Sequence, residues 1–326
     1  MMPTALSLPG GIDQEELLAQ LRPLCWGAAD ILRAYARGEQ PPHGFAAALT
    51  VADGGSGPVT AADLAVNQWL LQGLEASFPD APWTLLSEET AAEALQLGLP
   101  LPGEWLWLLD PLDGTKDFLL GTGEYAVHLA LVQRGKPVLG VVLLPESEEL
   151  WFGLLPQAST AAGAGWAGDS APAQPAGGSA WRENRSGERF APQLSTRRCT
   201  GELVLVASRS HRDSRLEQLL AALEPRETRV MGSVGGKVAT ILRGESDLYI
   251  SLSGSSAPKD WDMAAPEAVL RAAGGAFSHA DGQGLSYNKG DGLQAGCLVA
   301  SHGPNHAELC HKAAAAMGRI DPTFVL

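Results

Sequence analysis

The stretch Glu104-Trp-Leu-Trp-Leu-Leu-Asp110-Pro-Leu-Asp113-Gly-Thr-Lys-Asp-Phe118 decides the fold predicted for this chain. Its first part, Trp105 to Leu109, has the length and the apolar, aromatic composition of a buried β-strand. The strand stops at Asp110 and Asp113. Because Pro111 fixes φ near a turn value, the two carboxylates can fold towards each other across one tight corner. A buried strand that ends in paired carboxylates predicts oxygen ligands for a hard cation.

The next residues extend this prediction. Gly114 lets the backbone turn, and a helix that begins at Thr115 would point its free N–H groups at the same spot. Cation ligands and a phosphate-attracting helix start would then lie side by side, as metal-assisted chemistry on a phosphate ester requires. A surface turn is the alternative, because Asp-Pro-x-Asp-Gly is good turn chemistry anywhere.

Length and charge limit the class of protein. With 326 residues, 45% hydrophobic and 18% charged, the chain can form a sizeable core in two domains or one large two-part α/β unit. The formal net charge of −14 argues against nucleic acid or an anionic membrane as a partner, because both would be repelled. The N-terminus lacks the basic segment followed by an apolar segment that marks a signal peptide. No apolar run reaches the length of about 18 residues that a membrane-spanning helix needs, so we expect a cytoplasmic protein.

Hydrophobic periodicity predicts the surrounding elements. Helices are expected over Asp13 to Arg37 and after Val59, and strands over Tyr125 to Val132 and Pro137 to Leu144. The Ala-, Gly-, Ser- and Pro-rich segment 156–179 shows no periodicity and predicts a surface insertion.

A second part of the chain is expected after an irregular region. A new strand over Leu203 to Ala207 follows residues 195–201 and predicts a boundary. The N-terminal α+β part would then span residues 1–196 and carry most of the acidic motifs. The C-terminal α/β part would span residues 197–326.

Further carboxylates occur where other predicted elements begin or end. Asp63 follows Thr60 at close to capping-box spacing, Glu88 ends a second short strand, and Asp262 lies where a later helix begins. Open α/β sheets gather ligand sites at strand ends, which favours one acidic pocket. For Asp63 and Asp262 a purely structural role at a helix start remains open.

Other candidate ligand sites have weaker signals. The glycine- and serine-rich turn Val230 to Lys237 opens a helix and suits a phosphate or a nucleotide, but it equally suits packing. The four cysteines lack Cys-x-x-Cys spacing and are expected to be reduced and mostly buried. For the C-terminal cluster of His302, His306, Cys310 and His311 we favour a half-exposed helix over a metal site.

Four of these motifs occur in an order that resembles the lithium-sensitive, magnesium-dependent inositol monophosphatase superfamily. They are Val59-Thr60-Ala-Ala-Asp63, Ser87-Glu88-Glu89, Asp110-Pro-Leu112-Asp113-Gly114-Thr115 and Trp261-Asp262. The resemblance spans nearly the whole chain. It implies a layered α/β fold of αβαβα type, with metal ligands at the junction of its two halves.

The resemblance also implies a role for each matching residue. The implied ligands of two or three Mg²⁺ ions, with inhibition by Li⁺, are Glu88, Asp110, the Leu112 carbonyl, Asp113 and Asp262. Asp63 and Thr115, with Glu88 beside them, would position or activate the attacking water. The N–H groups of Gly114 and Thr115 would receive the phosphate.

The second half of the chain looks most like the 3'(2'),5'-bisphosphate nucleotidases. The matching segments are Ser208 to His211, Gly232 to Lys237 and Lys259 to Glu267. They imply that His211, Ser233, Lys237 and Asp262 contact a nucleotide. The implied substrate is adenosine 3',5'-bisphosphate, hydrolysed to AMP and phosphate, with adenylyl-sulfate 3'-phosphate as a second substrate.

Three questions stay open at this point. An inositol monophosphatase or another sugar phosphatase would use the same metal site, and a non-catalytic sensor of a phosphorylated metabolite is an alternative of another class. The sequence is compatible with a monomer or a homodimer. Many relatives carry a lysine shortly before Pro-Val-Thr that Thr50 to Asp53 lacks, which leaves the loop geometry near Asp63 open.

Overall fold

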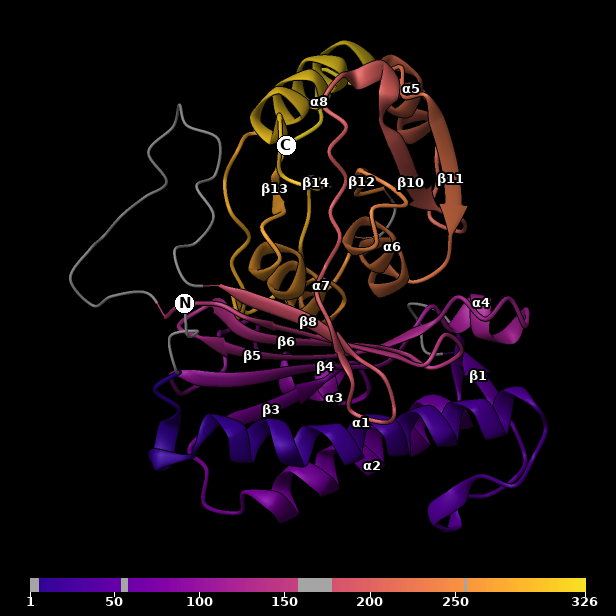
Figure 1. Cartoon of the computed structure of the whole chain (residues 1–326), viewed down its shortest axis with the longest axis vertical. Helices are drawn as coiled ribbons and strands as arrows, with labels where there is room; N and C mark the ends of the chain where they lie inside the picture. The colour runs from indigo at the N-terminus through magenta and orange to yellow at the C-terminus, as the bar shows by residue number, and fades with distance from the viewer. Residues whose placement is uncertain (1–5, 54–57, 158–177, 255–256) are drawn as a thin grey trace.

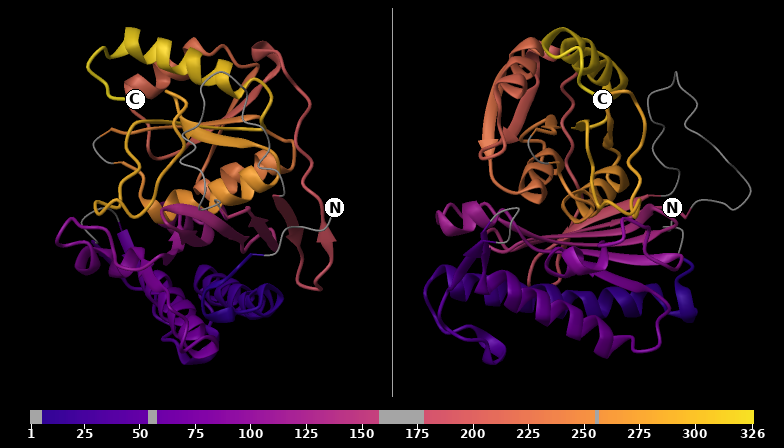
Figure 2. Two further views of the ribbon diagram at one scale, coloured as in Figure 1. Left: turned by 90° about the vertical axis from the view of Figure 1, so that its left-hand side faces the viewer. Right: turned by 180° about the vertical axis from the view of Figure 1, so that it is seen from behind.

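The computed structural model describes residues 6–53, 58–157, 178–254 and 257–326, which form five alternating layers of helix and sheet (Figure 1). One outer layer consists of α1 (Gln14–Ala36) and α2 (Ala61–Ser77). The middle helical layer, between the two sheets, consists of α6 (Val234–Leu242) and α7 (Asp260–Ala272). The other outer layer consists of α5 (Ser214–Ala222) and α8 (His306–Ile320). Figure 2 shows the same layers from two further sides. The predicted αβαβα arrangement is confirmed.

The sheet between α1/α2 and α6/α7 has seven strands in the order β3-β4-β5-β6-β7-β8-β9. The strands are β3 (Thr84–Ser87), β4 (Trp105–Asp113), β5 (Ala126–Gln133), β6 (Lys136–Leu144), β7 (Glu149–Leu154), β8 (Ser179–Glu183) and β9 (Arg189–Phe190). Strands β3 and β4 run parallel, with Ser87 opposite Leu109. Because parallel strands end at the same edge of a sheet, Glu88 and Asp110 follow these positions side by side.

The second sheet has five strands in the order β11-β10-β12-β14-β13. They are β10 (Val204–Ser208), β11 (Glu227–Met231), β12 (Leu248–Leu252), β13 (Ala276–His279) and β14 (Cys297–Ser301). The shorter elements are β1 (Val51–Asp53), β2 (Pro58–Thr60), α3 (Glu88–Ala94), α4 (Thr115–Leu119) and the 3₁₀ turns at Pro9–Gly11, Pro42–Gly44 and Thr200–Glu202. Strands β1 and β2 pair antiparallel, and residues 54–57 between them lie outside the described residues.

Helix α7 lies directly on the seven-stranded sheet because two glycines make room for it. Gly140 in β6 and Gly153 in β7 are opposite each other. A Cβ atom on Gly140 would lie 2.6 Å from the carbonyl oxygen of Ala265, and one on Gly153 would lie 2.5 Å from the Cα atom of Val269. These glycines therefore allow α7 to approach the sheet closely. Helix α7 also carries Asp262.

Replacing one of these glycines should destabilise the fold. We expect Gly153→Ala to lower the free energy of unfolding by about 2 kcal/mol, because the added methyl group overpacks the contact with the α7 backbone. Urea unfolding measures this value. The control is Gly318→Ala in α8, where an added Cβ meets no atom within 4 Å. Equal stability of the Gly153→Ala and wild-type proteins would contradict the close approach.

Residues from both predicted parts of the chain share one hydrophobic core. Val142 and Trp151 of the seven-stranded sheet pack in the same cluster as Met263, Leu270 and Phe277. The division into parts 1–196 and 197–326 therefore stays a prediction, and any such parts are joined by this core. Most of the predicted insertion 156–179 falls on residues 158–177, which lie outside the described residues.

The remaining predictions from the sequence concern the burial of the cysteines and the histidines near the C-terminus. Cys25, Cys297 and Cys310 are buried, whereas Cys199 is exposed. His306 begins helix α8, and its ring nitrogens lie 2.8 Å from Ser301 Oγ and 2.9 Å from Ser278 Oγ. His306, Cys310 and His311 lie in α8, which confirms a helix for these three. His302 precedes the helix, and because His302, His306 and Cys310 are buried, the expected half-exposure was wrong. Among the helices that the structure describes, none is both long and apolar enough to cross a membrane.

Candidate active site

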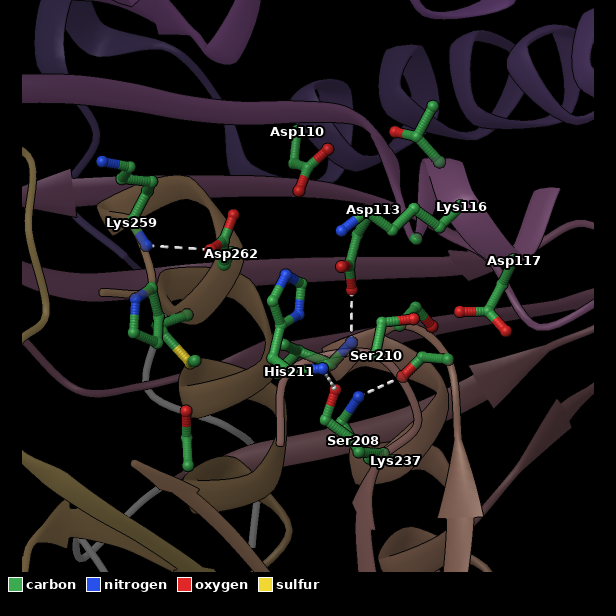
Figure 3. A pocket seen from close by; sticks show the side chains of 18 of the residues that line it. Asp110, Asp113, Lys116, Asp117, Ser208, Ser210, His211, Lys237, Lys259 and Asp262 are labelled. Carbon is green, nitrogen blue, oxygen red and sulfur yellow. Dashed lines mark hydrogen bonds between the residues drawn. The ribbon is translucent and has the colours of Figure 1, made fainter. Parts of the chain in front are cut away.

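One pocket, between the end of β4 and the starts of α6 and α7, collects nearly all predicted site residues (Figure 3). The predicted residues that line it are Glu88, Asp110, Leu112, Asp113, Gly114, Thr115, His211, Ser233, Lys237 and Asp262. Asp63 lies directly behind this lining, because Thr115 Oγ1 is 3.2 Å from Asp63 Oδ1. Segments more than 150 residues apart in sequence thus meet as the motif order predicted.

The corner after Asp110 is a β-bulge inside the strand. Strand β4 was expected to stop at Leu109, but it continues to Asp113 because β5 pairs with it on both sides of a register shift. Asp110 Oδ1 accepts the Leu112 N–H at 3.0 Å, which fixes this carboxylate across the bulge. Gly114 follows with φ of 95°, a conformation that strongly favours glycine. The prediction of a simple strand end was wrong here, although the carboxylates lie where it placed them.

The acidic side of the pocket concentrates negative charge. Burial and then the neighbouring carboxylate of Asp262 raise the pKa of Glu88 to about 8. Burial and then Asp113 raise the pKa of Asp262 to about 7. Burial and the same neighbours raise the pKa of Asp110 well above its usual range. The raised pKa values show that these buried carboxylates disfavour one another's negative charge. Their oxygens are hard donors that fit Mg²⁺.

These carboxylates do not yet form a closed metal centre. In the described parts of the chain, no three His, Cys, Asp or Glu side chains are grouped as ligands of one ion. Figure 3 shows Asp110 and Asp113 of β4 and Asp262 of α7 facing the same space. A divalent cation bound among them would offset the mutual repulsion of their charges.

Asp63 caps a helix and also lies next to the pocket. Its Oδ2 accepts hydrogen bonds from the Thr60 N–H at 2.7 Å and the Thr60 hydroxyl at 2.6 Å, completing a capping box for α2. Its Oδ1 faces the Thr115 hydroxyl, which also lies 3.1 Å from the Leu112 carbonyl. A hydroxyl has one hydrogen, so these two acceptors compete for it. Asp63 is therefore a helix cap and a neighbour of the pocket at once.

The opposite side of the pocket is basic. Burial is the main cause that lowers the pKa of His211; the charges of Lys116 and Lys237 lower it further, whereas Asp113 and Asp117 raise it, and the two lysines line the same pocket. Lys237 is buried, with a pKa lowered to about 8 by burial, and its ammonium donates to the Gly232 carbonyl. Ser233 Oγ accepts the Gly236 N–H at 2.9 Å and caps α6. Lys237 and Ser233 are thus already bonded within the protein.

The sequence analysis missed several groups around the pocket. Lys116 and Lys259 line it, and Arg209 pairs with Asp117 and, at 2.7 Å, with Glu124. A lysine in the first turn of a short helix opposes the helix dipole, and this signal could have identified Lys116. The ion pairs of Arg209 join the end of β10 to α4, which no local pattern indicates.

Comparison with known proteins agrees with this geometry. A sequence model described as the inositol monophosphatase family matches residues 13–317. The chain belongs to this family. In Salmonella typhimurium its relative "3'(2'),5'-bisphosphate nucleotidase CysQ" is 35% identical over 71% of this chain and 79% of its own length. The protein of the same name in Escherichia coli K12 is 31% identical over 83% of this chain and 94% of its own length.

Solved structures of the inositol monophosphatase family show the same fold. CysQ from Bacteroides thetaiotaomicron is 25% identical, with a TM-score of 0.62 over 89% of this chain and 98% of its own. The IMPase TM1415 of Thermotoga maritima is 20% identical, with a TM-score of 0.64 over 93% of this chain and 99% of its own.

Proposed function

We propose that this protein is a Mg²⁺-dependent phosphatase that hydrolyses adenosine 3',5'-bisphosphate to AMP and phosphate. The observation that carries the proposal is a single pocket in which buried carboxylates face a cluster of basic side chains. The names of the relatives from Salmonella typhimurium and Escherichia coli support the same substrate class.

The acidic side would hold the cations. The proposed ligands are Glu88, Asp110, the Leu112 carbonyl, Asp113 and Asp262, all of which line the pocket. When bound, two or three Mg²⁺ ions would neutralise phosphate oxygens and make the attacking water more acidic. Li⁺ is expected to inhibit.

Asp63 and Thr115 would hold the attacking water. When the Thr115 hydroxyl donates its hydrogen to Asp63 Oδ1, its lone pairs are free to accept a hydrogen of a water molecule in the pocket. The carboxylate of Asp63 can then take up that proton through the hydroxyl. Glu88 lies close enough to Asp63 for their charges to interact, which supports a role for its carboxylate beside the same water. The N–H groups of Gly114 and Thr115 would receive the phosphate that is released.

The basic side favours a substrate with a second phosphate. Lys116, His211 and Lys237 would face the 5'-phosphate while the 3'-phosphate meets the carboxylates. The inositol 1-phosphate molecule carries a single phosphate and would bring no second phosphate to these groups. Adenylyl-sulfate 3'-phosphate has the same 3'-phosphate and an anionic 5' group, and we propose it as a second substrate. Asp262 and Ser233 complete the proposed substrate contacts.

The negative net charge of −14 supports a small substrate that cations bridge to the protein, with neither nucleic acid nor membrane as a partner. We propose the cytoplasm as the compartment in which the reaction takes place.

Side-by-side assays test the proposal. Phosphate release would be measured from adenosine 3',5'-bisphosphate and from inositol 1-phosphate, with Mg²⁺, with EDTA, and with Li⁺ added to Mg²⁺. We expect a preference for the nucleotide that EDTA abolishes and Li⁺ reduces. Preference for the inositol ester would overturn the roles of His211, Ser233 and Lys237. Activity on neither would overturn the proposed substrate.

Removal of the buried ammonium group of Lys237 should raise KM for the nucleotide more than KM for a small ester. We expect Lys237→Met, which keeps most of the side-chain volume, to raise KM for adenosine 3',5'-bisphosphate about tenfold, because a charge-assisted contact to phosphate is lost. KM for a small ester with one phosphate should change little. Steady-state kinetics on both substrates measure the difference, with Lys312→Met on the surface of α8 as the control. Equal increases for both substrates would argue against nucleotide contact.

A further inference from the structure

One histidine is buried on the face of the seven-stranded sheet that packs against α6 and α7, directly across from Asp110 of β4. His128 lies on β5 and is fully buried. Its neighbours on the same face of the strand are Ala126, Ala130 and Val132, which belong to the hydrophobic core below α6 and α7. A polar ring in such a place loses its contacts with water and is costly unless something in the protein replaces them.

The imidazole ring of His128 lies next to the carboxylate of Asp113. His128 Nε2 is 3.3 Å from Asp113 Oδ2. The same oxygen accepts the N–H of Val234 and, at 3.2 Å, the N–H of Gly235. One oxygen of Asp113 is thus approached from β5 and from the start of α6, while the residue lines the pocket.

The start of α6 is shaped around this ring. A Cβ atom on Gly235 would lie 2.4 Å from His128 Nε2 and 2.8 Å from a methyl carbon of Val142. Glycine at this position lets the first turn of α6 reach both the imidazole and Asp113. The ring, the glycine and the carboxylate therefore fit one another as a set.

Hydrogen bonding within the described residues does not explain the burial of the ring. Within the described residues, neither His128 nitrogen makes a well-aligned hydrogen bond. The carbonyl of Trp261 is a second acceptor that attracts a ring hydrogen. A neutral ring carries one hydrogen, so Asp113 and Trp261 compete for it.

We propose that His128 is a positioning residue whose Nε2–H holds Oδ2 of Asp113, so that Oδ1 is directed at the cation. The inference rests on the metal site of the proposed function. Carboxylates that bind a metal are in general held by a further hydrogen bond, and loss of that partner weakens metal binding. His128 would add a third donor to this oxygen, beside the N–H groups of Val234 and Gly235, and it comes from β5, which carries none of the proposed ligands.

Magnesium binding without substrate provides the first test. Isothermal titration calorimetry would compare the wild-type protein with His128→Leu, which keeps the bulk, and His128→Gln, whose amide can donate at nearly the same place. We expect His128→Leu to weaken Mg²⁺ binding about tenfold and His128→Gln to restore most of the affinity. The matched control is His302→Leu, another buried histidine, whose Nε2 lies 2.7 Å from the Arg197 carbonyl.

The outcomes separate this inference from the proposed function. If wild type binds Mg²⁺ and both His128 variants bind it equally well, the inference is overturned and the metal site stands. The inference is also overturned if His128→Gln is no better than His128→Leu, or if His302→Leu weakens binding as much. Wild-type protein that binds no Mg²⁺ would overturn the metal site together with the inference.

The wild-type protein provides a second test that does not depend on a folded variant. Nitrogen-15 spectra of the histidine rings report which nitrogen carries the hydrogen. We expect the hydrogen of His128 on Nε2, with a shift of this signal when Mg²⁺ is added. A hydrogen on Nδ1, bonded to the Trp261 carbonyl, would overturn the inference.

Discussion

Asp113→Asn is expected to reduce kcat/KM for adenosine 3',5'-bisphosphate by at least about a thousandfold. The variant loses a charge that the proposed cations need, and a loss of several kcal/mol corresponds to this factor at about 1.4 kcal/mol per tenfold change. The fold should survive, because the amide oxygen of asparagine can still accept the N–H groups of Val234 and Gly235. The melting temperature should stay the same or rise, because Asp262 and Asp113 no longer repel each other.

The measurements are steady-state kinetics and thermal unfolding of the same preparations. Asp281→Asn, on an exposed residue, controls for the loss of one negative charge elsewhere. Loss of cooperatively melting protein in Asp113→Asn would show that Asp113 is mainly structural. An active Asp113→Asn variant would contradict the proposed metal site.

Asp63→Asn is expected to lower kcat about a thousandfold, with KM nearly unchanged. General base catalysis contributes a factor of this size, and an amide cannot take up the proton of the water that Thr115 holds. The capping box should be only partly weakened, because the amide oxygen can accept the Thr60 N–H. The melting temperature should therefore fall slightly while the rate falls steeply.

A second helix-start carboxylate provides the control for Asp63. Asp213 caps α5, where its Oδ1 accepts the Leu216 N–H at 2.9 Å. Asp213→Asn should cost a similar amount of stability and leave kcat unchanged. If Asp63→Asn behaves like Asp213→Asn in both measurements, Asp63 is a cap alone.

The features that the sequence predicted correctly depend on local patterns. An apolar run of strand length followed by Asp110 and Asp113 marks both a buried strand and its functional end. The spacing of Thr60 and Asp63 predicts a capped helix, and the cap is present. Helix and strand periodicity predicted individual elements, whereas the αβαβα layers were implied by the family that the order of the motifs suggested.

The features that the sequence missed depend on contacts between distant segments. The bulge after Asp110 exists because β5 pairs on both sides of it, and the pairing partner cannot be read from β4. Arg209 meets Asp117 only after β10 and α4 come together. His128 would pass as an ordinary strand residue, because its significance depends on Asp113 and Gly235 on other elements. The substrate roles of Ser233 and Lys237 stay predictions, since both are already bonded within the protein.

The place of α7 in the chain has a consequence for biosynthesis. The strands of the seven-stranded sheet are synthesised before the helix that covers them. The apolar face around Val142 and Trp151 therefore stays uncovered until residues 260–272 have left the ribosome. Asp262 arrives on that same helix. A chain stalled before this point therefore offers chaperones an uncovered sheet and lacks the Asp262 carboxylate of its acidic pocket.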